Sequence, residues 1–186
     1  MRKRLMKHLL FSCAVIVVLA GGARVLLGGV RGTPHDFSAA AWSKGEICLP
    51  CHASHRSSQE RYSWNHAYPS DSDFTKRPGA TLGLESLMCL GCHDGQTALD
   101  SFGGVTGSTL MTGGKVVGRD LSNDHPVGVV YPSADPRFKN RTMVEGDLRL
   151  YDGKIECCSC HDAHNNASGN FLRVESRQLC QTCHDY

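Results

Sequence analysis

The sequence has few apolar side chains beyond residue 32, and no apolar run there approaches the ~20 residues that cross a membrane. It also lacks the βαβ pattern in which a thioredoxin-like redox pair is found. Tryptophan and methionine are scarce, with two and five copies. Residues 33–186 are therefore expected neither to span a membrane nor to fold on side-chain packing alone.

Charge is unevenly distributed along the chain. Six of the 20 Lys and Arg lie in residues 1–32, which contain no acid, so the remaining 14 face all 18 Asp and Glu and leave residues 33–186 with a net charge of −4. Nucleic acid is bound by neutralising its phosphates with Lys and Arg. An acidic chain is thus expected to have no nucleic-acid partner.

The first 23 residues have the pattern of a secretory signal peptide. Residues 1–8 are basic, and residues 9–23 form an apolar run that ends in two glycines and an alanine. An uncleaved anchor is the alternative, but Arg24 and the glycines interrupt the run. We expect cleavage near residue 23, or as late as about residue 32, and one domain over residues 33–186. Export to the cell surface, the extracellular space or the periplasm also suits ten cysteines.

Eight of the ten cysteines belong to four C-x-x-C-H motifs, here called boxes one (48–52), two (89–93), three (157–161) and four (180–184). Thiols at positions i and i+3 and an imidazole at i+4 share one face of a helical turn, so all three reach one porphyrin. This pattern is typical of covalent haem c attachment. The predicted attachment residues are Cys48, Cys51, Cys89, Cys92, Cys157, Cys160, Cys180 and Cys183, and the proximal iron ligands are His52, His93, His161 and His184.

Other uses of paired cysteines fit less well. Zinc ribbons do not require a histidine after each second cysteine, and structural disulfides do not place one there. Cys158 falls outside the box-three spacing and is predicted to be a spare, buried thiol.

Distal ligands must come from histidines outside the boxes. Four irons need four such ligands, and five candidates follow the predicted signal peptide: His35, His55, His66, His125 and His164. His55 and His164 each lie three residues after a proximal histidine and cannot reach the far side of their own porphyrin. Box four begins soon after His164 in the sequence, so its haem iron is a nearby site for His164 to ligate. His55 is followed by no box at so short a distance along the chain. Methionine is the less favoured axial ligand.

The predicted fold is mostly coil, with short helices and one or two small β-hairpins wrapped around a four-haem stack. The porphyrins supply the apolar core that the side chains lack. A short helix is expected at residues 39–42, a strand at 127–131 and a hairpin at 148–157 that turns at Asp152-Gly153.

Taken together, several pieces of the chain resemble the doubled C-x-x-C-H multihaem cytochromes, and most of all the OmcE-type tetrahaem cytochromes that polymerise into extracellular conducting filaments. Besides the boxes, the pieces are His35-Asp36-Phe37-Ser38, Trp64-Asn65-His66, Asp124-His125-Pro126 and Asp162-Ala163-His164. The resemblance implies bis-histidine haems in a continuous stack and long-range electron transfer. It also implies a histidine that ligates a haem of the next subunit, a role expected for His55.

The sequence therefore predicts an exported tetrahaem electron carrier without a catalytic site, which forms filaments with copies of itself and exchanges electrons with redox proteins or extracellular acceptors. Two alternatives remain open at this point. One is a monomeric periplasmic shuttle, and the other is the electron-donating subunit of a haem-containing reductase, which would show one five-coordinate iron.

Overall fold

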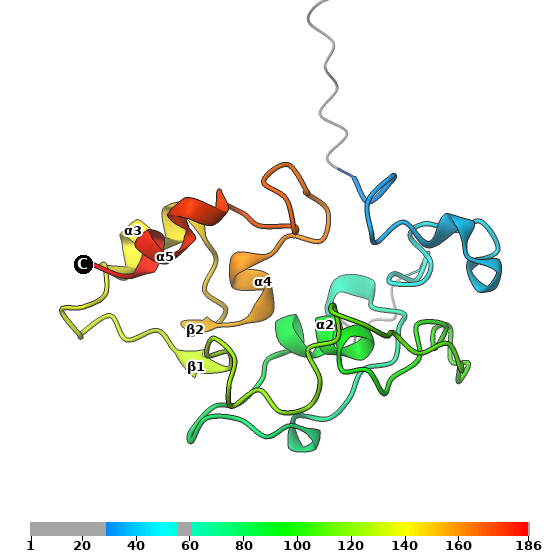
Figure 1. Ribbon diagram of the computed structural model, residues 1–186, viewed down its shortest axis with the longest axis horizontal. Helices are drawn as coiled ribbons and strands as arrows, with labels where there is room; N and C mark the ends of the chain where they lie inside the picture. Colours follow the sequence, from blue (N-terminus) through cyan, green and yellow to red (C-terminus); the bar gives the residue numbers. More distant parts are fainter. Residues whose placement is uncertain (1–28, 56–60, 186) are drawn as a thin grey trace, which may run out of the picture.

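The computed structural model describes residues 29–55 and 61–185, so the predicted signal peptide lies outside the described residues. Most of the described chain is coil with few short helices, as predicted, and it contains one two-stranded antiparallel sheet whose strands are far apart in the sequence. Figure 1 shows these elements along a chain that turns back repeatedly. In order they are η1 (Phe37–Ala39), η2 (Ala41–Ser43), η3 (Arg61–Ser63), η4 (Asp71–Asp73), α2 (Leu84–His93), β1 (Val129–Val130), α3 (Arg141–Asp147), β2 (Lys154–Ile155), α4 (Cys157–Cys160) and α5 (Ser176–Cys183).

Two small apolar clusters hold these elements. One contains Phe74, Leu82, Leu90 and Leu121, and it fixes α2 against the coil on either side. The other is built on Tyr131, Val144 and Leu148, with partly buried residues of β2, α4 and α5 packed around it. Helices α3 and α5 pack against each other beside this second cluster (Figure 1).

The expected hairpin forms only as a turn. Asp152 and Gly153 have φ angles of 50° and 77°, and Tyr151 and Lys154 exchange main-chain hydrogen bonds across them, which is the turn that Asp-Gly favours. Residues 148–150 do not form its first strand. Instead β2 pairs with β1, Val129 opposite Ile155, because Leu148 is buried in the second cluster and takes this segment away from the sheet.

The helices of boxes two and three are joined by a buried hydrogen-bond network. Ser86 of α2 donates to Glu156 Oε2 at 2.5 Å and accepts the Cys157 amide at 2.9 Å. The Gly83 amide donates to Glu156 Oε1 at 3.0 Å, and Ser159 Oγ accepts from the Glu156 amide. Boxes two and three are thereby fixed relative to each other.

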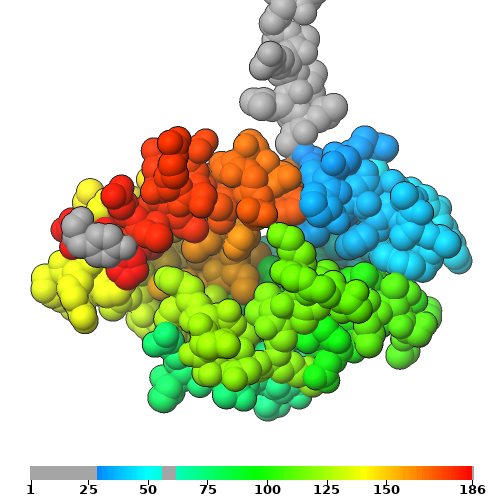
Figure 2. All heavy atoms as spheres, in the orientation of Figure 1, coloured from blue at the N-terminus to red at the C-terminus, as the bar shows by residue number. Residues whose placement is uncertain are grey.

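The N-terminal segment lies beside a loop near the other end of the chain. Figures 1 and 2 show residues 29–55 next to the loop that follows α4, and the rings of His35 and Phe171 stack there with centroids 4.3 Å apart. The helix expected at residues 39–42 is two 3-10 turns, η1 and η2, separated at Ala40. No helix within residues 29–55 and 61–185 combines the length and apolar character needed to cross a membrane.

Candidate functional site

Each box adopts a turn of helix that places its histidine after its second cysteine. Box two lies inside α2, box three is α4, box four ends α5, and box one is a single turn without a longer helix. In boxes one, three and four the histidine amide donates to the carbonyl of the first cysteine, at 2.8, 3.1 and 2.9 Å. The local backbone thus presents two sulfurs and one imidazole together, as the spacing predicts.

The proximal histidines of boxes one to three are each held by a main-chain carbonyl. The Nδ1 of His52, His93 and His161 donates to the carbonyls of Tyr62, Lys115 and Asn170, at 3.0, 2.7 and 2.9 Å. A carbonyl only accepts, so the proton is on Nδ1 and the Nε2 lone pair is left for a metal. Metal-ligating histidines in proteins are typically held in this way.

Two proximal histidines have a second imidazole at the separation that an iron requires. The ring centroids of His93 and His35 are 6.2 Å apart, and those of His52 and His164 are 5.8 Å apart. Metal–nitrogen bonds of ~2 Å on opposite sides of one iron place two ring centroids ~6 Å apart. The position of His164 differs from the expectation that it faces box four, because the loop after α4 turns towards box one.

His35 is held in its neutral form. Burial, together with the neighbouring imidazoles of His93 and His164, lowers the pKa of His35 to about 4. A neutral imidazole keeps the lone pair that iron binds, so His35 is suited to the ligand role that its position opposite His93 indicates.

His125 lies near box four. Burial first, and then the charge of His184, lower the pKa of His125, which places these two imidazoles within electrostatic reach. The ring of Phe138 packs on that of His184, with centroids 4.6 Å apart. Box four therefore has its own candidate partner within the chain.

The remaining two candidates differ from each other. His66 is buried, and its two nitrogens face the carbonyls of Ala67 and Leu99 at 2.6 and 3.2 Å, an environment that leaves little room for a metal bond. His55 is exposed and makes no hydrogen bond or ring contact with the described part of the chain. His161 is also exposed, and no second imidazole stacks on it among the described residues.

The box cysteines are not arranged as a metal cluster. Burial raises the pKa of Cys51 to about 11, of Cys92 to about 12 and of Cys160 to about 11. Within residues 29–55 and 61–185, no three His, Cys, Asp or Glu side chains converge on a point as a bound metal ion requires.

Cys158 lies where α2 meets α4. A hydrogen bond with the Cys89 thiol lowers the pKa of Cys158, and its carbonyl accepts from Arg173 Nε at 2.9 Å. The spare thiol is thus a packing neighbour of box two as well as of box three.

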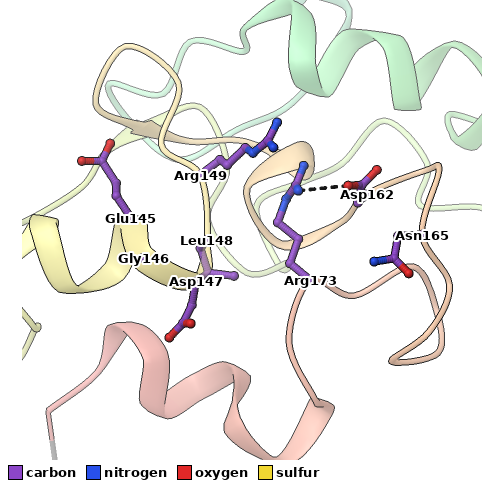
Figure 3. A pocket seen from close by; sticks show the side chains of 8 residues that line it. All are labelled: Glu145, Gly146, Asp147, Leu148, Arg149, Asp162, Asn165 and Arg173. Atoms are coloured by element: carbon purple, nitrogen blue, oxygen red, sulfur yellow. Dashed lines mark hydrogen bonds and ion pairs between the residues drawn. The ribbon is translucent and has the colours of Figure 1, made fainter. Parts of the chain in front are cut away.

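The aspartates that follow three of the boxes differ in environment. Asp94 is buried and paired with Arg119 at 3.0 Å, whereas Asp162 is paired with Arg173 at 3.1 Å beside a cavity of about 340 Å³. Figure 3 shows this ion pair, with Arg149 pointing to the same region. Asp185 is exposed at the end of α5. The charges of Asp94 and Asp162 are therefore compensated by arginine.

Sequence reasoning did not find the carbonyls that hold the proximal histidines, the Ser86–Glu156 network, or the surroundings of Trp64. Trp64 packs edge-on against His52, with centroids 5.8 Å apart, and its buried Nε1–H has no acceptor among the described residues. A buried donor of this kind needs an acceptor, which a haem carboxylate would supply. Of these features, the sequence indicated only Trp64, an aromatic residue two positions before His66.

The comparison with known families gives one result. The family model of the doubled CXXCH motif matches residues 151–186, which contain boxes three and four. No curated protein matches the chain. The match supports a multihaem c-type cytochrome, in which CXXCH motifs carry covalently bound haem c.

Proposed function

We propose that the protein is an exported tetrahaem c-type cytochrome that carries electrons along a stack of bis-histidine haems and has no catalytic site. The observation that carries this proposal is the pair of imidazoles at 6.2 and 5.8 Å across boxes two and one, each with its proximal Nδ1 held by a carbonyl. Multihaem cytochromes c are generally electron carriers, and a six-coordinate iron has no open position for substrate.

The residues present fit haem c. Each box provides two sulfurs for the thioether bonds and an Nε2 for the iron, and the bound haem would supply an iron that alternates between the ferric and ferrous states. His35, His164 and His125 would serve the irons of boxes two, one and four. Burial lowers the pKa of His35 and of His125, which keeps the lone pairs of these two imidazoles available for iron.

His35 lies within electrostatic reach of His161 as well as of His93, and with His35 assigned to box two the iron of box three is left for a ligand from outside the chain. His161 and His55 are both exposed, and His66 already faces two carbonyls. We assign His55 to the box-three iron of a neighbouring copy, which makes the iron–nitrogen bond part of a filament contact. The basic and apolar segments in residues 1–23 support export, which would place such filaments outside the cell.

Mass spectrometry of the denatured, haem-loaded protein tests the count. The mature chain should weigh four haems more than its sequence, and three or fewer would contradict it. Visible absorption should show only low-spin iron, since a high-spin band would instead favour a reductase subunit.

His55→Ala tests the filament. The variant should keep four attached haems, but its assemblies should be absent or shorter, and one iron per chain should lack its distal histidine. Ser54→Ala, a change at the adjacent exposed residue, is the matched control and should leave assembly intact. A variant lacking His55 that still assembles with all irons low-spin, or an unmodified protein that stays monomeric, would favour the periplasmic shuttle.

A further inference from the structure

The loop after α4, residues 162–171, ends in two residues with a left-handed backbone. Asn170 and Phe171 have φ angles of 48° and 57°. Asparagine tolerates this conformation, but it is an outlier for a bulky residue such as phenylalanine. A disfavoured backbone conformation persists only where the surrounding structure fixes it, and such positions cluster at functional sites. The contacts of these two residues, here called the loop corner, therefore indicate what the conformation serves.

Hydrogen bonds hold the loop corner in place. The Asp162 amide donates to the Phe171 carbonyl at 2.7 Å, and the Phe171 amide donates to Asn166 Oδ1 at 2.9 Å. The Arg173 amide donates to the Cys160 carbonyl at 2.9 Å, which ties the end of the loop to the box-three helix. The loop is thus closed on itself, and its corner keeps a fixed position relative to box three.

The loop contacts imidazoles that belong to two different boxes. The Asn170 carbonyl accepts from Nδ1 of His161, the proximal histidine of box three, at 2.9 Å. Phe171 is 8% exposed, and its ring stacks on that of His35, with centroids 4.3 Å apart and planes 9° apart. The Ala163 carbonyl accepts a hydrogen bond from the same His35 ring. An imidazole held by a stacked ring and a carbonyl has little freedom to turn, so one loop orients rings of boxes two and three.

From these contacts we propose that Asn170 and Phe171 are positioning residues for the axial ligands of two haems. The Phe171 ring sets the plane of the His35 imidazole at the iron of box two. The Asn170 carbonyl sets the plane of the His161 imidazole at the iron of box three. The inference rests on the haem ligation of the proposed function and adds what fixes the orientation of the ligands. Because adjacent residues do both, a change in the backbone of the loop corner alters both irons together.

The planes of the paired imidazoles differ between the boxes. The rings of His35 and His93 are inclined by 69°, and those of His52 and His164 by 24°. Each axial imidazole interacts with the iron d orbitals through its π system, so the axial ligands tune the electronic structure of the iron. Crossed planes give a low-spin ferric iron a strongly anisotropic electron paramagnetic resonance (EPR) signal, whereas nearly parallel planes give a rhombic one. Boxes two and one should therefore be distinguishable by EPR.

EPR of the oxidised, fully haem-loaded protein tests the role of Phe171. The unmodified protein should show a strongly anisotropic signal that is lost from His35→Ala, which assigns it to box two. Phe171→Leu keeps an apolar side chain but removes the flat ring, so the box-two signal should shift or broaden while the rhombic signal of box one is retained. Phe171→Tyr keeps the stacked ring and should retain the unmodified spectrum. Phe138→Leu removes the ring that packs on His184 and is the matched control, which should leave the box-two signal unchanged.

Asn170→Val tests the backbone of the loop corner, and it keeps the test decisive if Phe171→Leu does not fold, because residue 170 is exposed. A β-branched residue disfavours a φ of 48°, so two signals should shift together. These are the box-two signal and the box-three signal, which is the one lost from His161→Ala. Asn170→Gly is the matched control. Glycine adopts positive φ readily and keeps the carbonyl, so both signals should stay unchanged.

A box-two signal that is unchanged in Phe171→Leu or in Asn170→Val would overturn the proposal. An equal shift of that signal in Phe138→Leu would also overturn it, because general loosening of the fold would then account for the change. The same holds if the unmodified protein has four low-spin haems but no anisotropic box-two signal. Loss of haem mass or a high-spin iron in the unmodified protein would instead overturn the proposed function, so the two failures are distinguishable.

Discussion

Box three is α4 and box four ends α5, and Cys160 and Cys183 pack directly on the second apolar cluster. Box two lies inside α2, which the first cluster packs against the coil on either side, whereas box one is a single turn without a longer helix. The partner rings of boxes one and two, moreover, involve the loop after α4, through His164 beside His52 and Phe171 behind His35. The helices of the C-terminal pair thus pack on one shared cluster, whereas the N-terminal pair takes its partner rings from the loop that follows α4 and from the N-terminal segment.

The largest effect is expected from removing an attachment thiol in the C-terminal pair. Cys157→Ser should lose attachment at box three, because a thioether requires the sulfur at that position, and the denatured mass should fall by about one haem. Cys158→Ser, one residue away, should keep all four haems. The reverse pattern would mean that Cys158 belongs to the box.

Phe171→Ala tests whether the N-terminal pair depends on the distant loop. The side chain is buried against the His35 ring, so its loss should cost about 3–5 kcal/mol of unfolding free energy. Hydrogen exchange should rise in residues 29–55 and stay slow in α3 and α5. Phe138→Ala, which removes the ring on His184, is the matched change in the other half and should raise exchange near α5 instead. Equal changes in both halves would contradict the comparison.

Arginine substitutions should have smaller effects that differ between the halves. Arg119→Met leaves the buried Asp94 carboxylate without its cation and should cost about 1–3 kcal/mol. Arg137→Met removes a partner of Asp135 at the surface, where solvent screens the charges, and should leave the free energy of unfolding nearly unchanged. Chemical denaturation of the haem-loaded protein measures the free energy of unfolding of each variant. Similar losses in the two variants would show that burial does not make the Asp94 ion pair more important for stability than the Asp135 ion pair.

The smallest effect is a pH dependence from Asp94. Burial alone would raise the pKa of Asp94. The hydrogen bonds from the amides of Thr97 and Gln96 and from the Arg119 guanidinium together outweigh burial, so the pKa lies below its usual value. The stabilisation is therefore present above the unfolded value of ~4 and is lost as pH falls through the lower folded value. The difference in Tm between the unmodified protein and Asp94→Asn should narrow over that range. A difference that is constant with pH would contradict the assignment.

Local sequence predicted local structure. The i, i+3, i+4 spacing predicted the turn of each box, and Asp152-Gly153 predicted the turn before box three. The pairing of β2 with β1 could not be predicted in this way, since it depends on Leu148 entering a cluster formed by residues far apart in the chain. The same holds for His164 beside His52, which depends on the path of the loop after α4. The site residues were thus recognisable by type, and their partners only from the tertiary fold.

The carbonyls that hold His52, His93 and His161 come from Tyr62, Lys115 and Asn170, which are 10, 22 and 9 residues further along the chain. Every amino acid carries a main-chain carbonyl, so a side-chain substitution at any of these three positions leaves the acceptor in place. The orientation of the proximal ligands is therefore robust to point mutation and sensitive to insertions or deletions that shift the backbone. For these three contacts, the length and path of the coil between boxes are constrained more strongly than its side chains.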